Sequence, residues 1–212
     1  MDDLKKRSKK VLTLLKKNYP DAHCTLNYRS PLELLVAVIL SAQCTDERVN
    51  IVTKDLFKKF RTAKDYASAR REELEQGIRS TGFYRNKAKS ILGASKIIAE
   101  KYHGKVPDTM EGLLELPGVA RKTANVVLGN AYHKATGVVV DTHVFRLSQR
   151  LGFSKKDQPE KVEEDLMVLI PKKDWIKFGH MMILHGRYVC KAKKPLCGKC
   201  FLNKDCPSAF SF

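Results

Sequence analysis

Apolar side chains recur at helical spacing along almost the whole chain. Val11, Leu14 and Leu15 form one such stripe, which ends before Pro20. Because residues three and four apart share one face of an α-helix, this spacing predicts amphipathic helices packed against a core. Strand signals are weak, since Val138–Val140 is the only β-branched run of note. The pattern therefore predicts an all-α fold.

One predicted helix is apolar on all sides. Ser30 and Glu33 have the spacing of a capping box, with Pro31 at the first helical position. Residues 34–40 are then continuously apolar, so this helix is expected to lie buried at the centre of a domain. Further helices are predicted at residues 49–60, 88–99, 109–114, 120–132, 141–151, 159–170 and 175–189.

The charge of the chain is strongly positive. Lysine and arginine number 40, aspartate and glutamate 23, and the formal net charge is +17 over 212 residues. Such a basic chain favours a polyanionic partner, either nucleic acid or an anionic membrane.

Membrane insertion and secretion are not expected. The apolar run 34–40 is far shorter than the ~20 residues of a membrane-spanning helix. The first six residues also lack the apolar segment of a signal peptide. In the reducing compartment that follows, the six cysteines are expected to be ligands or free thiols rather than disulfides.

A short motif connects two of the predicted helices. Residues 116–122 read Leu-Pro-Gly-Val-Ala-Arg-Lys, and Gly118 permits a tight turn. The N–H groups that open the following helix have no intrahelical acceptor, so they form a site for an anion such as a DNA phosphate. An ordinary turn between two helices explains the same residues, and the turn alone does not decide between the two.

The longer sequence around this turn favours the anion-binding interpretation. Residues 116–128 resemble the helix-hairpin-helix signature of the endonuclease III family of DNA glycosylases. Residues 40–46, 81–84 and 140–144 match the same family in order, and the resemblance covers nearly the whole chain. The family usually has glycine where this chain has Ala120, so we expect a slightly altered turn that still contacts phosphate.

The resemblance implies a two-lobed helix-hairpin-helix DNA glycosylase fold. Residues 25–134 are expected to form a six-helix barrel domain that ends with the hairpin. Residues 1–24 and 135–212 are expected to form an iron–sulfur cluster domain. DNA would lie along the cleft between these lobes.

Lys122 is the candidate nucleophile. It falls in the first turn of the helix after the hairpin, where the helix dipole and Arg121 disfavour the protonated amine. A neutral amine can attack C1′ of a deoxyribose and form a Schiff base. Most lysines in so basic a chain only bind phosphate, but the nucleophilic lysine of the family falls on Lys122. The adenine-mismatch glycosylases share the fold and lack this lysine, so the bifunctional type is favoured.

Asp141 is the second candidate catalytic residue. It stands where the N-cap of the predicted helix 141–151 is expected. An ionised carboxylate near C1′ can stabilise positive charge as the base departs and help to activate the amine. In the resembling family the aspartate at this position has that role. His143 is expected to contact phosphate or pack locally rather than catalyse.

Two residues are candidates to fill the space that an everted base leaves. The target base must leave the stack before C1′ can be attacked. By resemblance, Gln43 enters from one side and Phe83 is the wedge from the other, where the family often has leucine. Core packing is the alternative for Phe83 and Tyr84. The other residues predicted to contact DNA are Leu116, Gly118, Ala120, Arg121, Lys191, Lys193 and Lys194.

Four cysteines near the end have the spacing C-x6-C-x2-C-x5-C, at Cys190, Cys197, Cys200 and Cys206. Four thiolates hold either a structural zinc ion or a [4Fe–4S] cluster, and the spacing alone leaves zinc ahead. The resemblance favours a structural [4Fe–4S] cluster. Ligation also explains how a segment with few apolar residues folds. Cys24 and Cys44 are expected to be packed free thiols.

Together these features predict a bifunctional DNA glycosylase and AP lyase of base excision repair. Its substrate would be double-stranded DNA with an oxidised pyrimidine or an abasic site. A monomer in the cytoplasm is expected, associated with the nucleoid in a prokaryote. Two other classes stay open: a non-catalytic DNA-binding module, and a ferredoxin-like electron carrier, which the basic charge disfavours.

Overall fold

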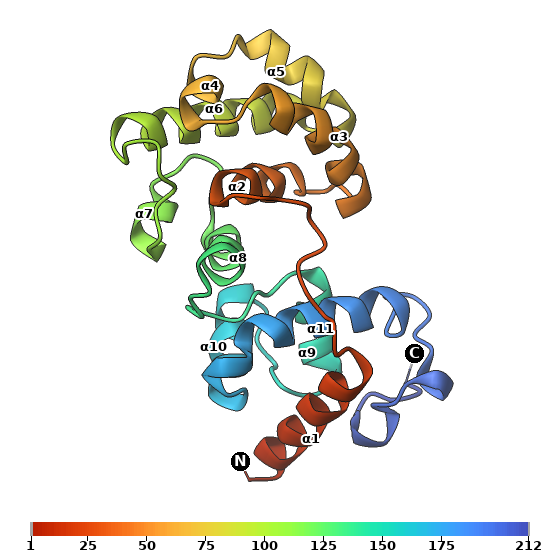
Figure 1. The fold of residues 1–212 in the computed structure, drawn as a ribbon. Coiled ribbons are helices and arrows are strands. Elements are labelled where there is room, and N and C mark those ends of the chain that lie inside the picture. The colour runs from red at the N-terminus through yellow and green to blue at the C-terminus, as the bar shows by residue number, and fades with distance from the viewer. Residues whose placement is uncertain (1, 212) are drawn as a thin grey trace. The chain divides into compact units, whose positions relative to one another are not determined.

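A computed structural model describes residues 2–211, and their contacts divide the chain into two compact units. Unit 2 is Thr25–Lys134, and unit 1 combines the segments before and after it. Within the described residues, the regular elements are α-helices and short 3-10 helices, without strands (Figure 1). The predicted all-α fold is therefore confirmed. None of the helices in this range combines the length and apolar character needed to span a bilayer.

Unit 2 is arranged around one buried helix. Its elements are α2 (Pro31–Leu40), α3 (Asp46–Lys59), α4 (Ala63–Ala67), α5 (Arg71–Ile78), η1 (Arg79–Thr81), α6 (Tyr84–Glu100), α7 (Met110–Leu114) and α8 (Arg121–Tyr132). All residues of α2 from Leu34 to Leu40 are buried, and the helix packs against α3, α6 and α8. The continuous apolar run thus has the central position that it predicts.

The start of α2 has only half of the predicted capping box. Ser30 Oγ accepts a hydrogen bond from the N–H of Glu33 at 3.2 Å. The Glu33 carboxylate, however, accepts the N–H of Arg29 at 2.6 Å and also binds the Arg29 guanidinium at 3.0 Å. The prediction of a full box was wrong because this carboxylate has a charged partner one residue before the N-cap.

Two short helices, α4 and α5, lie outside the ranges that the apolar pattern predicts. A complete capping box begins α4: Thr62 Oγ1 accepts the N–H of Asp65, and Asp65 accepts the N–H of Thr62. The two backbone N–H groups of Arg61 and Thr62 lower the pKa of the Asp65 carboxyl. The Thr-x-x-Asp spacing was therefore the available sequence signal for α4.

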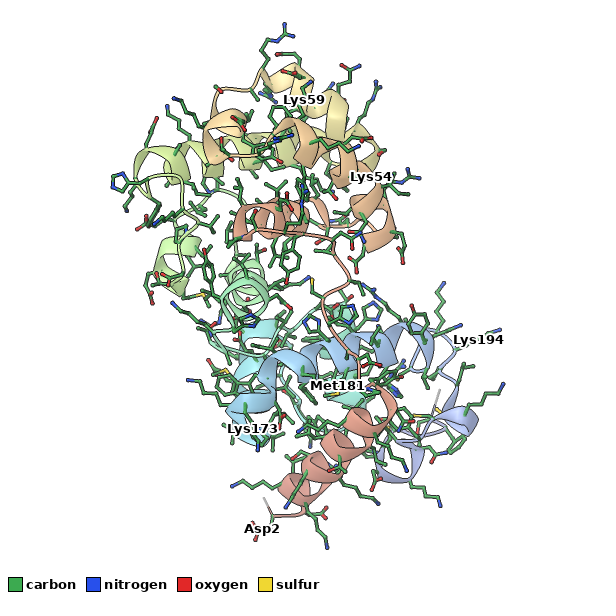
Figure 2. All side chains as sticks on the ribbon, in the orientation of Figure 1. Asp2, Lys54, Lys59, Lys173, Met181 and Lys194 are labelled. Atoms are coloured by element: carbon green, nitrogen blue, oxygen red, sulfur yellow. The ribbon has the colours of Figure 1, made fainter. Side chains whose placement is uncertain are left out.

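Unit 1 is built around a long helix, α11 (Trp175–Tyr188). Its other elements are α1 (Asp2–Asn18), α9 (Thr142–Arg150), α10 (Pro159–Leu169), η2 (Lys172–Asp174), η3 (Cys197–Lys199) and η4 (Asn203–Asp205). Helix α11 packs against α1 and α9, and Met181, labelled on α11 in Figure 2, is fully buried in this core. Val138 and Val140 also belong to the core. Two residues of the β-branched run are thus buried, and the run forms no strand.

Candidate active site and metal centre

The hairpin of unit 2 consists of α7, a turn at residues 115–120, and α8. Gly118 has φ +79°, and a Cβ there would lie 2.5 Å from Cβ of Ser90 on α6. The N–H of Val119 donates to the carbonyl of Leu116 at 3.1 Å. Leu116 is only 2% exposed, and its own N–H donates to the carbonyl of Leu113 at 3.1 Å, so its contact with DNA stays a prediction. The turn therefore requires glycine at position 118 for both its backbone and its packing.

Helix α8 begins without a side-chain cap. Its N-cap is Ala120, whereas the hydroxyl of Thr109 caps α7 by accepting the N–H of Gly112. The N–H groups of the first turn of a helix have no intrahelical acceptor, and the dipole adds positive potential there. Ala120 is exposed with φ −95°, a conformation that alanine adopts freely. The backbone therefore does not require glycine at 120.

Lys122 is the second residue of α8, and its side chain is exposed. Within residues 2–211 its amine makes no hydrogen bond and no ion pair, unlike that of Lys134, just beyond the C-terminal end of α8, which is paired with Asp108. An amine without an acidic partner is free to approach an electrophile. This arrangement is what the predicted role of Lys122 requires.

Gln43 and Phe83 lie in two loops of unit 2. Gln43 follows α2 with φ +53°, and Phe83 precedes α6 with φ +47°. Residues other than glycine in this region cost about 1–3 kcal/mol, and they cluster at functional sites. Both side chains are exposed, Phe83 at 63% of its surface. Core packing as the explanation for Phe83 was therefore wrong, while its role as a wedge stays a prediction.

Asp141 is the N-cap of α9, as predicted. Its Oδ1 accepts the N–H groups of His143 and Val144, each at 2.8 Å. No hydrogen bond to Oδ2 is made within the described chain, so this oxygen is available to a substrate. The capping bonds fix the carboxylate relative to α9. A carboxylate that is to stabilise a developing positive charge has to be held in place in this way.

His143 takes part in the packing of α9 against α11. A Cβ added at Gly186 would lie 2.8 Å from the His143 ring, so glycine is needed for this contact. Arg146 Nη2 lies 3.3 Å from His143 Nδ1 and donates to the carbonyls of Gly186 and Cys190. Local packing is one of the two roles predicted for His143, and the structure contains that packing.

The four predicted ligands, Cys190, Cys197, Cys200 and Cys206, line one cavity in unit 1. Apolar side chains of Leu147, Leu151, Leu196 and Leu202 enclose it. Among residues 2–211, no three His, Cys, Asp or Glu side chains converge closely enough to hold a single metal ion. Four thiols around a cavity fit a polynuclear cluster, whereas a zinc site needs them around one point.

Two polar groups contact the sulfur atoms around this cavity. Arg150 Nη1 lies 3.3 Å from Cys190 Sγ, and the N–H of Leu202 donates to Cys200 Sγ at 3.4 Å. Burial raises the pKa of the Cys200 and Cys206 thiols, so a positive ligand is needed to hold them as thiolates. Sequence reasoning missed Arg150, although two arginines four residues apart on a predicted helix were a possible signal.

In the loop between the first two cysteines, the backbone is hydrogen-bonded and the lysine side chains are exposed. Arg150 donates to the carbonyls of Lys191 and Ala192 at 2.9 and 2.8 Å. Lys191, Lys193 and Lys194 are all exposed, and Lys194 points away from the loop (Figure 2). The loop therefore presents three positive charges from a braced backbone.

The candidate residues are distributed over both units. Lys122, Gln43, Phe83 and the hairpin belong to unit 2, whereas Asp141, His143, the basic loop and the cysteines belong to unit 1. The pairing of Lys122 with Asp141 across one substrate therefore stays a prediction.

Comparison with known proteins identifies the family. Residues 36–172 match the family model of the HhH-GPD superfamily of base excision DNA repair proteins. Endonuclease III of Synechocystis is 57% identical over 209 residues, covering 99% of this chain and 95% of the relative. The chain belongs to the endonuclease III family. Endonuclease III of Bacillus subtilis is 50% identical, covering 89% of this chain and 86% of its own.

A solved structure and a match to an iron–sulfur binding domain also support membership in the endonuclease III family. A trapped endonuclease III–DNA covalent intermediate is similar with a TM-score of 0.94 and 49% identity, covering 98% and 97% of the two chains. Residues 190–206 match the iron–sulfur binding domain of endonuclease III, so the predicted [4Fe–4S] cofactor is confirmed. The assignment of the four cysteines as its ligands is a proposal that the cavity supports.

Proposed function

We propose that this chain is a bifunctional DNA glycosylase and AP lyase of base excision repair that uses Lys122 as nucleophile. The observation that carries this proposal is the amine of Lys122, which is exposed and has no partner among residues 2–211, directly after the hairpin turn of a chain of the endonuclease III family. A lysine nucleophile is what a glycosylase needs to combine base removal with strand cleavage, because the imine it forms permits elimination.

The proposed reaction begins with the neutral Lys122 amine attacking C1′ of an everted deoxyribose. The C1′–N bond to the base breaks, the base leaves with the electron pair and takes up a proton, and the sugar ring opens to an imine. Loss of a C2′ proton then expels the 3′ phosphate, and hydrolysis of the imine frees the lysine. Asp141 stabilises the positive charge that develops on the sugar as the base leaves.

DNA would be held mainly through its phosphates. The uncapped N-terminus of α8 and the turn at Gly118 offer N–H groups to one phosphate, and Arg121 lies beside them. The three lysines of the 191–196 loop offer charge to another. Gln43 and Phe83 would occupy the gap in the stack from which the damaged base has been everted.

The four cysteines of residues 190–206 are proposed to hold a cluster with a structural role. A [4Fe–4S] cluster, when bound, supplies covalent bonds between turns that have few apolar contacts of their own. The sugar chemistry above transfers no electron, so the cluster is not part of it. Arg150 then holds the basic loop at a fixed place beside this centre.

The substrate is proposed to be double-stranded DNA with an oxidised pyrimidine or an abasic site, bound by a monomer. Such a protein acts where the chromosome is, which in a bacterium is the cytoplasm and its nucleoid. A panel of single lesions in duplex DNA tests this, with base release and strand nicking scored separately. We expect both products from oxidised pyrimidines and nicking alone from abasic sites. Binding without either product would favour a non-catalytic DNA-binding module.

Gly118→Ala is expected to weaken binding to a duplex with a stable abasic analogue by about tenfold or more. The new Cβ meets Ser90, and the left-handed backbone costs a further 1–3 kcal/mol or so, which misplaces the N–H groups of the turn. Gly104→Ala is the matched control, because Gly104 has φ +80° with open space around it. This control should lose stability but keep its affinity for DNA. Equal affinities of the two variants would contradict the proposed role of the hairpin.

A further inference from the structure

A buried lysine connects two loops of unit 2. Lys87, on the first turn of α6, is 5% exposed. Its ammonium donates to the carbonyl of Leu40 and to the carbonyl of Thr81, each at 2.8 Å. Residues 40 and 81 are far apart in sequence, so one side chain joins two otherwise separate segments.

The two carbonyls lie two or three residues before the two predicted gap-filling residues. Leu40 is the last residue of α2, three residues before Gln43. Thr81 is the last residue of η1, two residues before Phe83. The terminal carbonyls of a helix have no intrahelical donor, so each is open to the lysine. Both Gln43 and Phe83 have a left-handed backbone, which persists only when the surrounding structure holds it.

Core stability alone does not account for this lysine. Burial lowers the pKa of Lys87, and no carboxylate forms an ion pair with it among residues 2–211. A buried cation without an ionic partner is unfavourable compared with an apolar side chain of similar volume. What an apolar side chain cannot do is bind two carbonyls at once and thereby set the distance between the loops that carry them.

We propose that Lys87 is a positioning residue that holds the Gln43 and Phe83 loops at one separation, so that both side chains enter the DNA gap together. This inference rests on the proposed function, because it gives the two loops a shared task in base eversion. Lys87 touches neither the sugar nor the base. Its effect reaches the reaction only through the placement of Gln43 and Phe83.

A double-mutant cycle tests this coupling, since non-additivity separates action through the two loops from general destabilisation. Lys87→Met is made in the wild-type chain and in a chain that carries Gln43→Ala and Phe83→Ala. Base release from an oxidised pyrimidine is measured under single-turnover conditions. Misplacement of a positioning group by about 1 Å can cost roughly 100-fold in rate, so we expect a loss of that order in the wild-type chain. In the doubly substituted chain we expect less than about threefold.

A spectroscopic readout reports eversion directly. With 2-aminopurine opposite the lesion, wild-type binding changes the fluorescence because the stack around this base is disturbed. Lys87→Met is expected to lose this change, and Lys87→Arg, which keeps two donors, to recover part of both the signal and the rate. Lys96→Met is the matched control on α6, because Lys96 is exposed and forms its ion pair with the equally exposed Glu100. It should behave as the wild type.

The results separate the two proposals. If Lys87→Met does not fold, the cycle is repeated with Lys87→Gln, which stays polar but whose shorter side chain cannot bind both carbonyls as the ammonium does. Equal rate losses in both backgrounds, or a folded Lys87→Met with wild-type rate and fluorescence, would overturn the positioning role. Failure of the wild-type chain to release any base would instead count against the proposed function.

Discussion

Lys122→Gln is expected to abolish capture of the protein on damaged DNA by borohydride, and with it both base release and strand nicking. Glutamine has nearly the length of lysine and stays polar, but its amide nitrogen is not a nucleophile. We therefore expect the rate to fall by more than about 10³-fold, as for removal of other covalent nucleophiles. Gel mobility of the reduced complex and single-turnover product formation measure this.

The variant is expected to fold like the wild type. Lys122 is exposed and makes no hydrogen bond or ion pair within residues 2–211, so its replacement leaves no group unsatisfied. Lys96→Gln is the matched control, since it also removes one exposed charge from unit 2. A Lys122→Gln protein that still forms a reducible covalent complex would show that another amine is the nucleophile.

Asp141→Asn is expected to slow base release by about 10²–10³-fold, the usual effect of removing one group that stabilises transition-state charge. Asparagine is as good an N-cap as aspartate, so the bonds to His143 and Val144 are expected to persist and stability to change by less than about 1 kcal/mol. The substitution therefore removes the charge and keeps the local structure. Single-turnover base release and thermal unfolding provide the two measurements.

A capping control separates charge from stability. Thr62→Ala removes a helix cap in unit 2, which costs about 1 kcal/mol, and should leave base release unchanged. Asp141→Ser keeps a capping oxygen without charge and should be as slow as Asp141→Asn. If Asp141→Asn released base at the wild-type rate, the carboxylate would be a cap and no more.

Local sequence signals predicted most helices and the hairpin. The run 34–40 predicted the buried α2, and Asp141 predicted the start of α9, because apolar spacing and capping act within a few residues. The exposure of Phe83 was not predictable in this way, since an aromatic residue beside an apolar stripe is as suitable for a core as for a surface. Whether such a residue is buried depends on its neighbours in space, which come from other segments of the chain.

Contacts between separate segments could not be predicted from the sequence. Lys87 appeared in the sequence as one lysine among many, and its two acceptors are 47 and 6 residues away. Arg150 contacts Cys190, one of the four proposed ligands, across 40 residues. No motif marks the contacts of Lys87, and the four-residue spacing of Arg146 and Arg150 does not identify a partner, because each contact depends on how helices pack. The joint action of Lys122 and Asp141 on one sugar likewise stays a prediction.

The division of the chain has a consequence for biosynthesis. Unit 2 is one continuous segment, Thr25–Lys134. All residues that form its core have therefore been translated before the C-terminal segment of unit 1, residues 135–212, emerges from the ribosome. Helix α1 must wait, because its side-chain contacts are with Leu169, Asp174 and Asp205. Its apolar face, with Val11 and Leu15, therefore stays uncovered in the nascent chain for most of translation. We therefore expect unit 2 to fold before unit 1, although unit 1 begins first along the chain.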